Sequence, residues 1–515
     1  MSIRAGIQKL TDGLRDLLGG PQSAEPYRGG EINRLNKKWQ PDKLSGDAAI
    51  NLNWDLLTRR IRDLGRNDPA LIALKRAQVD HVVGDGIGTT AAVMVGDELD
   101  DEFNTSADDE FEWWSENEAD VAGQLGWPDI QRQFFDQMLE TGEALLLECT
   151  RGDPERQMPL CYQPLEAEQI DQNKDQPPRD GQNEIIRGVE VDRWKMPVAY
   201  WLFDVHPGDY HNFQTQSVRV DARRVIHVTL PGRPSQVRGA SLYNSITLTA
   251  KDLDNYLGNE LTASNLGSLF TLIHKTQHPG MGMGFVGDGT ETSDTDDAGN
   301  QKVRLGRGIV CQVDQKDSVE AFEPKRPNRD ARVFTDLMLL LLAMGGNVSP
   351  YRLTRDYSGT TYVAARAAHL DDRAAFRPIQ GYLARTLCLP VRRRWTKLAV
   401  AGGILRSVSA QQFLRQQRRW QRVKIVTPAY EQIDPEKETD ADIAAIGAGL
   451  TTQEDVCARR GKKDWRRVIL QRKREIAFAA KQGVELNYDR PSTPAKPRAS
   501  DDAESRGAGE QGSRK

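Results

Sequence analysis

Residues 241–266 read SLYNSITLTAKDLDNYLGNELTASNL, and this stretch decides the architecture that we expect for the chain. Apolar side chains recur there at steps of three and four, at Leu242, Ile246, Ala250, Leu253, Leu257 and Leu261. This spacing is typical of one face of an α-helix. At 3.6 residues per turn the helix has about seven turns, which exceeds the average length of a helix in a globular protein. The sequence therefore predicts one long helix with an apolar stripe.

The segments that follow predict a partner for this helix. A strand-like segment at 269–274 precedes a Gly-rich acidic loop at 278–300 and further strands at 302–313 and 319–322, and a second apolar helix comes next at 330–344. We expect a helix pair with a small β-containing insertion at its far end. The side chains expected to pack the pair are Leu242, Ile246, Leu253, Leu257, Leu261, Phe334, Leu337 and Leu341.

The chain before the pair has a mixed pattern. Residues 1–18 have the apolar spacing of an amphipathic helix, and a Gly- and Pro-bearing linker follows to residue 50. Residues 51–235 alternate helical segments with strand-like runs. Asp68 can cap a new helix that has Pro69 at its first position, so a helix break is expected there. This region is predicted to form an α/β unit.

The chain after the pair is predicted to be helical. A loop at 345–359 leads into a long helical stretch at 360–397, which Pro378 and Pro390 are expected to bend. Further helices are expected at 437–483. The tail from residue 490 has too little apolar surface to fold and is expected to be disordered. The fold class predicted for the whole chain is helix-rich α+β.

The bulk composition is hydrophilic for a chain of this size. The 515 residues are enough for two to four structural units. Hydrophobic residues make up 38% of the chain and charged residues 28%, although large domains bury enough surface to hold more apolar residues. Two explanations fit: a disordered tail with charged helices, or an extended subunit with large polar faces, as in a ring or fibre.

Charge is distributed unevenly along the chain. The net charge of −4 gives no chain-wide attraction to nucleic acid. Residues 91–120 nevertheless hold twelve carboxylates and no Lys or Arg, whereas residues 391–424 hold ten Lys or Arg and no carboxylate. Each block is either a solvated face or one of two complementary surfaces of neighbouring subunits.

Cysteine spacing and hydropathy restrict the environment. The five cysteines are scattered without a CxxC pair, which argues against a disulfide framework or a structural zinc site and favours a reducing cytosol. The first 20 residues lack the apolar core of a signal peptide, and no apolar run approaches the ~20 residues of a membrane span. We expect no membrane association.

Catalytic motifs are weak or missing. The G-x-G-x-x-G match at 282–287 is followed by an acidic run that would repel phosphate. The calcium-loop-like residues 294–299 have Ala298 at the fifth ligand position and Leu305 at the twelfth, where a bidentate Glu is required. The histidines show no metal-ligand spacing. The sequence therefore predicts no catalytic residue, cofactor or metal, and favours a structural role.

Short segments in a fixed order add a resemblance. They are NDP at 67–69, VDHVVGDGI at 79–87, FEWW at 111–114, DQMLETGEA at 136–144, PGRP at 231–234, RGAS at 238–241, KDLDNY at 251–256, GGNVSP at 345–350, YS at 357–358, AARAA at 364–368, IDPEKE at 433–438 and GAGLTT at 447–452, with Gly461. Together they resemble the lambda-type bacteriophage or prophage portal protein family over about 400 residues. No single segment is specific, but their shared order is.

The resemblance implies an architecture of wing, stem, clip, tunnel loop and crown. On this chain the N-terminal helix and linker would be 1–50, the wing 51–240, the first stem helix 241–267, the clip 268–325, the second stem helix 326–345, the tunnel loop 346–359, the long kinked helix with its return to the wing 360–436, the crown 437–488 and the disordered tail 489–515. The long N-terminal linker and the Gly/Asp-rich insertion at 278–300 depart from the family pattern.

The resemblance also implies a function without chemistry. Subunits of such a protein form a closed ring, typically a dodecamer, around a channel for packaging and ejecting double-stranded DNA. The implied partners are terminase, the head-tail adaptor, and the major capsid and scaffold proteins, since the ring also nucleates capsid assembly. The implied location is a capsid vertex of the virion, after assembly in the host bacterial cytoplasm.

Arg352, Arg355 and Tyr357 fall in the expected tunnel loop and are the candidates for touching DNA in the channel. The alternative for all three is ordinary solvation of a loop. Two competing functions stay open: another minor head or scaffold-type protein, and a DNA-binding packaging enzyme subunit that uses the basic block at 392–422 with Trp395 and Trp420. That block has no accompanying carboxylate cluster to hold magnesium.

Overall fold

The computed structural model describes residues 34, 37–210, 216–230, 232–268, 330–430, 434–461 and 464–486, with four short strands between 272 and 314. The chain divides into two compact units, Met1–Leu52 and Asn53–Lys515. In the described part of the first unit, helix α2 (Gly46–Asn51) begins where the Ser45 hydroxyl accepts a hydrogen bond from the Ala48 N–H. The expected amphipathic helix at 1–18 and the expected disordered tail lie outside the described residues.

Helices α3 (Trp54–Asn67) and α4 (Pro69–Val82) open the second unit. The predicted break between them is confirmed, because the Asp68 carboxylate caps α4 at the Leu71 N–H over 2.7 Å and Pro69 begins the helix. The acidic helix α5 (Asp101–Asn117) and helix α6 (Trp127–Thr141) complete the helical side of this unit. Trp114, Trp127 and Phe135 are buried among these helices.

Antiparallel sheets form the other side, and the expected α/β mixture is confirmed. β4 (Glu143–Thr150) lies between β10 (Val225–Thr229) and β5 (Leu160–Leu165) in a three-stranded sheet. A second sheet has the order β6 (Glu184–Ile186), β7 (Val189–Val191), β8 (Pro197–Leu202) and β9 (Val218–Asp221). β1 (Gly88–Ala91) pairs with β15 (Val423–Val426), so chain segments more than 300 residues apart share one ladder. The remaining short elements are β2 (Met94–Val95), β3 (Glu98–Leu99), η2 (Ala167–Gln169) and η3 (Ala222–Arg224).

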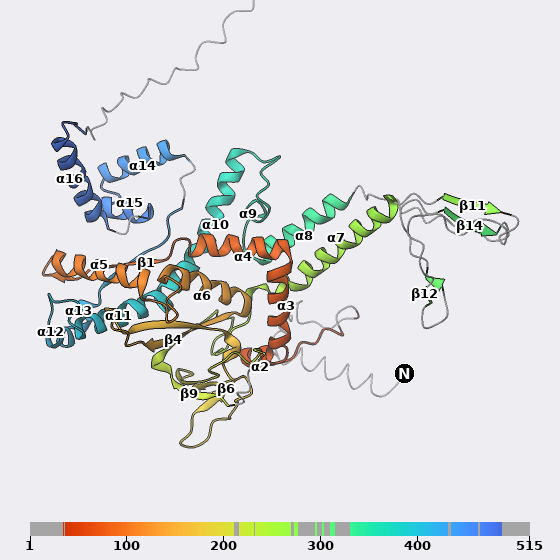
Figure 1. Cartoon of the computed structure of the whole chain (residues 1–515), viewed down its shortest axis with the longest axis horizontal. Coiled ribbons are helices and arrows are strands. Elements are labelled where there is room, and N and C mark those ends of the chain that lie inside the picture. Colours follow the sequence, from red (N-terminus) through yellow and green to blue (C-terminus); the bar gives the residue numbers. More distant parts are fainter. Residues whose placement is uncertain are drawn as a thin grey trace, which may run out of the picture. The chain divides into compact units, whose positions relative to one another are not determined.

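The predicted helix pair is present, but its first helix begins at Thr247 and not at Ser241. A 3₁₀ turn η4 (Leu242–Ser245) precedes α7 (Thr247–Ser268), because the Ser241 hydroxyl caps that turn at the Tyr243 N–H. α8 (Ala331–Gly345) runs alongside α7, as Figure 1 shows. A Cβ on Gly345 would fall well inside van der Waals contact with Ile246, so a side chain at that position would force the base of the pair apart.

Between the two helices the described residues form four short strands. β11 (Leu272–Thr276) pairs in parallel with β14 (Val310–Asp314), and β12 (Asp294–Thr295) pairs with β13 (Gln301–Lys302). The β-containing insertion is therefore confirmed. The strand expected at 319–322 and most of the Gly/Asp-rich loop lie outside the described residues.

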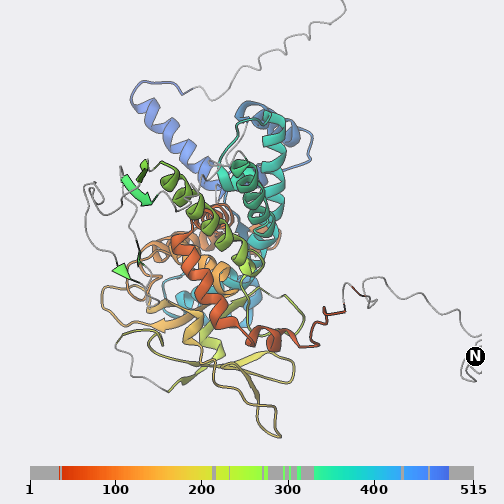
Figure 2. The same ribbon diagram turned by 90° about the vertical axis from the view of Figure 1, so that its right-hand side faces the viewer.

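The long bent helix consists of three segments. α10 (Tyr362–Leu383) contains Pro378, a wider π-helical turn η5 (Ala384–Cys388) follows, and α11 (Leu389–Ala401) begins with Pro390 at its first turn. Proline has no N–H to donate to the preceding turn, and a π turn is one way for a helix to pass such a position. α10 packs against α4, and α11 packs against α5 (Figure 1, and turned by 90° in Figure 2).

The C-terminal part contains the expected helices. α12 (Ala410–Arg415) and α13 (Gln417–Trp420) lead to β15, and α14 (Pro435–Gly447), α15 (Gln453–Arg459) and α16 (Trp465–Lys481) follow. Arg466 and Arg467 at the start of α16 pair with carboxylates of α5, namely Asp101, Asp109 and Glu112. The helix-rich α+β class predicted from the sequence is confirmed.

Candidate functional site: an apolar helix pair, its adjoining loop and two buried charge clusters

The helix pair α7–α8 is buried at its base and apolar on its surface. Ile246, Leu253 and Leu342 are each at most 3% exposed. Large apolar side chains that are at least 40% exposed lie along both helices: Leu248, Leu257, Leu261, Val333, Phe334, Leu337, Leu340, Leu341 and Met344. Monomeric soluble proteins seldom expose a continuous apolar patch larger than a few hundred Å², so this surface is typical of a protein interface.

The structure brings together only part of the predicted packing set. Ile246 and Leu253 lie in the core, and Phe334 packs on the Tyr256 ring with centroids 4.6 Å apart. Leu242, Leu257, Leu261, Leu337 and Leu341 are 40–64% exposed within one subunit. Their packing in an assembly stays a prediction.

Arg352 lies in the loop at 345–359, and its side chain contacts three residues outside that loop. The loop contains helix α9 (Pro350–Thr354), which the Ser349 hydroxyl caps. The guanidinium of Arg352 donates to Asp372 Oδ2 over 3.2 Å, to His81 Nε2 over 2.5 Å and to His369 Nδ1 over 2.7 Å. Its side chain is only 16% exposed. Arg352 therefore ties α9 to α4 and α10.

The two histidines of this network favour their neutral forms. Burial, reinforced by the positive charge of Arg352, lowers the pKa of His81 to about 4. The same two causes lower the pKa of His369. An arginine can only donate hydrogen bonds, so the ring nitrogen facing it must accept and carry no proton. The geometry and the pKa directions therefore agree.

Arg355 and Tyr357 are more accessible than Arg352. Arg355 adopts a left-handed backbone with φ of 55°, and its side chain is exposed without an ion pair among the described residues. Tyr357 is 41% exposed and stacks on Tyr351 at a centroid distance of 6.0 Å, with its hydroxyl 3.3 Å from His369 Nε2. Of the three loop candidates, Arg352 is occupied by internal contacts, whereas Arg355 and Tyr357 present surface. DNA contact by any of them stays a prediction.

The acidic and basic blocks meet inside the subunit. Arg392 donates to Asp108 over 2.6 Å, and both side chains are nearly buried. The Arg392 guanidinium lies 4.3 Å from the Phe111 ring centroid, and burial lowers its pKa while burial raises the pKa of Asp108. Part of each block is thus a buried internal contact, an outcome that neither of the two sequence interpretations included.

A second buried cluster joins β4 to the segment that precedes α7. Glu143 and Arg238 are both fully buried, and Arg238 donates to the Glu143 carboxylate through Nε over 2.9 and 3.0 Å. The Gly239 N–H and His227 complete the shell around the carboxylate. Burial alone would raise the pKa of Glu143, but Arg238 and His227 together hold it well below its usual range. Isolated residues in the sequence do not reveal this cluster.

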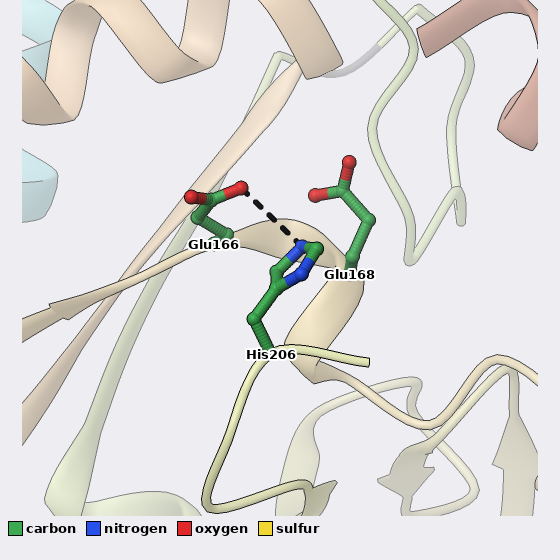
Figure 3. A group of neighbouring side chains, drawn as sticks. All are labelled: Glu166, Glu168 and His206. Atoms are coloured by element: carbon green, nitrogen blue, oxygen red, sulfur yellow. Dashed lines mark ion pairs between the residues drawn. The ribbon is translucent and has the colours of Figure 1, made fainter. Parts of the chain in front are cut away.

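Glu166, Glu168 and His206 also lie close together, and they are the described residues whose geometry comes nearest to a metal site (Figure 3). Turn η2 places Glu168 beside Glu166, and His206 Nε2 is 3.5 Å from Glu166. However, Arg62 of α3 pairs with Glu166 over 2.6 Å and with Glu168 over 2.9 Å. Because Arg62 already supplies positive charge to both carboxylates, we assign this cluster to internal ion pairing.

None of the described helices is long and apolar enough to span a membrane.

Comparison with known proteins gives a consistent family. Residues 33–380 match the model of the phage portal protein, lambda family. The chain is 24% identical to the probable portal protein of Halomonas phage phiHAP-1 over 86% of this chain and 84% of that protein, and 24% identical to the portal protein of Escherichia phage N15 over 87% and 88%. Portal protein B of Escherichia phage lambda is 22% identical, over 85% and 86%.

Solved structures similar to this chain include the neck of a native GTA particle computed with C12 symmetry. That chain is 12% identical, with a TM-score of 0.39, over 80% of this chain and 93% of its own length. A chain from the virion of a native gene transfer agent particle is also 12% identical, with a TM-score of 0.37, over 79% and 93%. The family match alone covers well over half of the sequence, and on that ground this chain belongs to the lambda family of phage portal proteins.

Proposed function

We propose that this chain is the portal subunit of a phage or prophage, and that its copies form a closed ring around a channel for double-stranded DNA. The family match gives the role, and the exposed apolar face of α7–α8 is the observation on this subunit that supports it. In a ring, one patch of each subunit binds a different patch of the next. Each large apolar side chain buried there contributes about 1.5–3 kcal/mol.

The subunit performs no chemistry in this proposal. DNA enters during packaging and leaves during ejection, while a separate terminase supplies the energy. Head-tail adaptor, major capsid and scaffold proteins are the further partners, and the assembled ring occupies a capsid vertex after forming in the bacterial cytoplasm. Of the three loop candidates, Arg355 and Tyr357 are exposed and would meet DNA in the channel. Few such contacts suit a channel, because phosphate contacts from many subunits would sum and stall the DNA.

Ring formation is tested by negative-stain electron microscopy with native mass measurement. The wild-type protein, with scaffold protein added if needed, is expected to form closed rings with a central hole. The variant Leu337→Asp/Leu341→Asp is expected to stay a folded monomer or small oligomer, because both side chains are exposed within the subunit. Leu414→Asp on α12 is the matched control, since Leu414 is 65% exposed but lies outside the helix pair. A wild-type protein that forms no ring even with scaffold would contradict the proposal.

A further inference from the structure

A group of basic side chains on the surface forms no ion pair with any residue that the structure describes. Residues 391–424 contain ten Lys or Arg and no carboxylate. Three of the ten pair internally: Arg392 with Asp108, Arg394 with Glu148, and Lys424 with Glu454. Six others are exposed and form no ion pair with any described residue, and we call them the wing basic patch: Arg393, Lys397, Arg406, Arg415, Arg418 and Arg422.

The fold gathers these residues from α11, α12, α13 and the turns that adjoin these helices. Arg393 and Lys397 are four residues apart on α11, which places them on one face. α11 packs on α12, and α12 packs on α13. The Gln421 side chain, just after α13, donates to the Arg393 carbonyl over 3.3 Å. The ends of the patch are therefore neighbours, and Figure 1 shows the three helices together at one edge of the wing.

Beside the patch is a groove with positively charged walls. Arg418, Arg419 and Arg422 line a volume of about 410 Å³ together with Met94 and Gly96. Arg419 is fixed in place, because it donates to the Met94 carbonyl over 2.8 Å and to Gln416 Oε1 over 3.1 Å. A preformed wall of this kind loses less side-chain entropy on binding an anion than free arginines would.

The chemistry of the surface favours phosphate as the ligand. Arginine donates in a planar fork that matches phosphate oxygens, and the intervening residues of α12 and α13 add glutamine amides. Protein partners usually require aromatic or apolar anchors, and Leu414 is the one large apolar residue of 389–424 that is described as exposed. Trp395 is buried and Trp420 is half-buried, so no ring is available to stack with the bases of a single strand.

We propose that the wing basic patch binds the phosphate backbone of duplex DNA, without sequence preference, at a surface separate from the channel. The site goes beyond the proposed channel function, because one subunit carries the whole patch. In a ring the patches repeat on every copy and form a belt that holds duplex lying outside the channel. Six neutralised phosphates per subunit correspond to a slope of about −5 in log binding constant against log salt concentration.

The test uses relaxed, covalently closed circular duplex, which cannot thread a ring that is already closed. Binding to purified protein is followed by electrophoretic mobility shift between about 50 and 200 mM salt. Arg393→Gln/Arg415→Gln/Arg418→Gln removes three charges whose side chains form no hydrogen bond or ion pair with a described residue. This variant is expected to bind the circle at least tenfold more weakly at low salt, with a slope smaller in magnitude by about 3.

The matched control is Arg66→Gln/Arg76→Gln/Arg179→Gln, which removes the same charge from exposed residues outside the patch. It is expected to bind the circle as the wild type does, as is Arg355→Gln in the loop at 345–359. Equal affinity and slope for the patch variant and the wild type would overturn the inference. So would a patch variant that loses affinity for polyglutamate but keeps its affinity for the circle, since the patch would then serve an acidic protein.

Electron microscopy of the same samples separates this inference from the proposed function. Rings that fail to bind circular DNA through the patch would refute the inference and leave the portal role intact. Patch-dependent binding by a protein that forms no ring would refute the portal role and leave the inference intact. Circular dichroism of the patch variant is expected to match that of the wild type, because glutamine has nearly the helix propensity of arginine.

Discussion

Replacing Arg238 with Met tests how the subunit holds its sheet to the start of the helix pair. Arg238 and Glu143 are both fully buried, and Arg238 also donates to the Arg187 carbonyl over 2.6 Å. The substitution keeps the volume of the side chain but leaves a carboxylate buried without its main counter-charge. Breaking a buried pair on one side costs about 3–5 kcal/mol. We expect Arg238→Met to lower the unfolding free energy of this region by that amount at pH 7.

The double variant Glu143→Gln/Arg238→Met removes the isolated charge and is expected to recover about 1–3 kcal/mol of the loss. The pH dependence has a definite sign. In the wild type the pKa of Glu143 is lowered, so the stability from this group is present above its ordinary value of about 4.3 and is lost as the pH falls toward the folded value. In Arg238→Met the buried carboxylate prefers its protonated form, so the cost of the substitution shrinks as the pH falls from 7 to 5.

Hydrogen exchange measured by mass spectrometry on peptides of β4 and of the segment before α7 provides the assay. It reports the local unfolding free energy of the region that holds the pair. Glu143→Gln alone is the control for the amide substitution. A loss below 1 kcal/mol for Arg238→Met, or a loss that is the same at pH 7 and pH 5, would refute the reasoning.

Three further predictions address the loop, the helix pair and the charged blocks. Because the pKa of His81 is lowered to about 4, protonation on going from pH 7 to pH 5 opposes the native loop, and faster amide exchange in α9 is expected; unchanged exchange would contradict this. Gly345→Ala is expected to cost about 1–3 kcal/mol by overpacking against Ile246, and Ile246→Ala in the same chain should recover part of it in thermal melts. Arg392→Ala leaves Asp108 buried and unpaired, so about 3–5 kcal/mol should be lost in urea denaturation, whereas the exposed Arg418→Ala should lose under 0.5.

Local sequence signals were sufficient for much of the secondary structure. The break at Asp68 and Pro69 was predictable because a capping carboxylate and a proline at the first helical position act within one turn. The helix pair was predictable from apolar spacing, β8 from its valine, tyrosine and tryptophan, and β4 from its short apolar run. The start of α7 differed, since Ser241 caps a 3₁₀ turn first, a choice that its contacts with the core decide.

The candidate site was less predictable than the fold. The sequence placed Arg352, Arg355 and Tyr357 in one loop but did not show which of them is occupied by internal contacts and which are exposed. Arg352 is occupied because His81, 271 residues earlier in the chain, lies at the end of α4 beside it. In the same way, the acidic and basic blocks were interpreted as surface features. The structure instead buries an ion pair between Arg392 and Asp108, which are 284 residues apart in sequence.

By itself, the sequence determined the helix-rich α+β class, the order of the regions, the helix pair and the family resemblance, because capping, periodicity and turn chemistry act over a few residues. Only the tertiary structure decided which charges are buried together, which part of the apolar stripe is covered, and which exposed basic residues form no ion pair with a described residue. Those outcomes depend on contacts between segments hundreds of residues apart. A charge becomes a core pair or a binding surface according to the segment that folds against it.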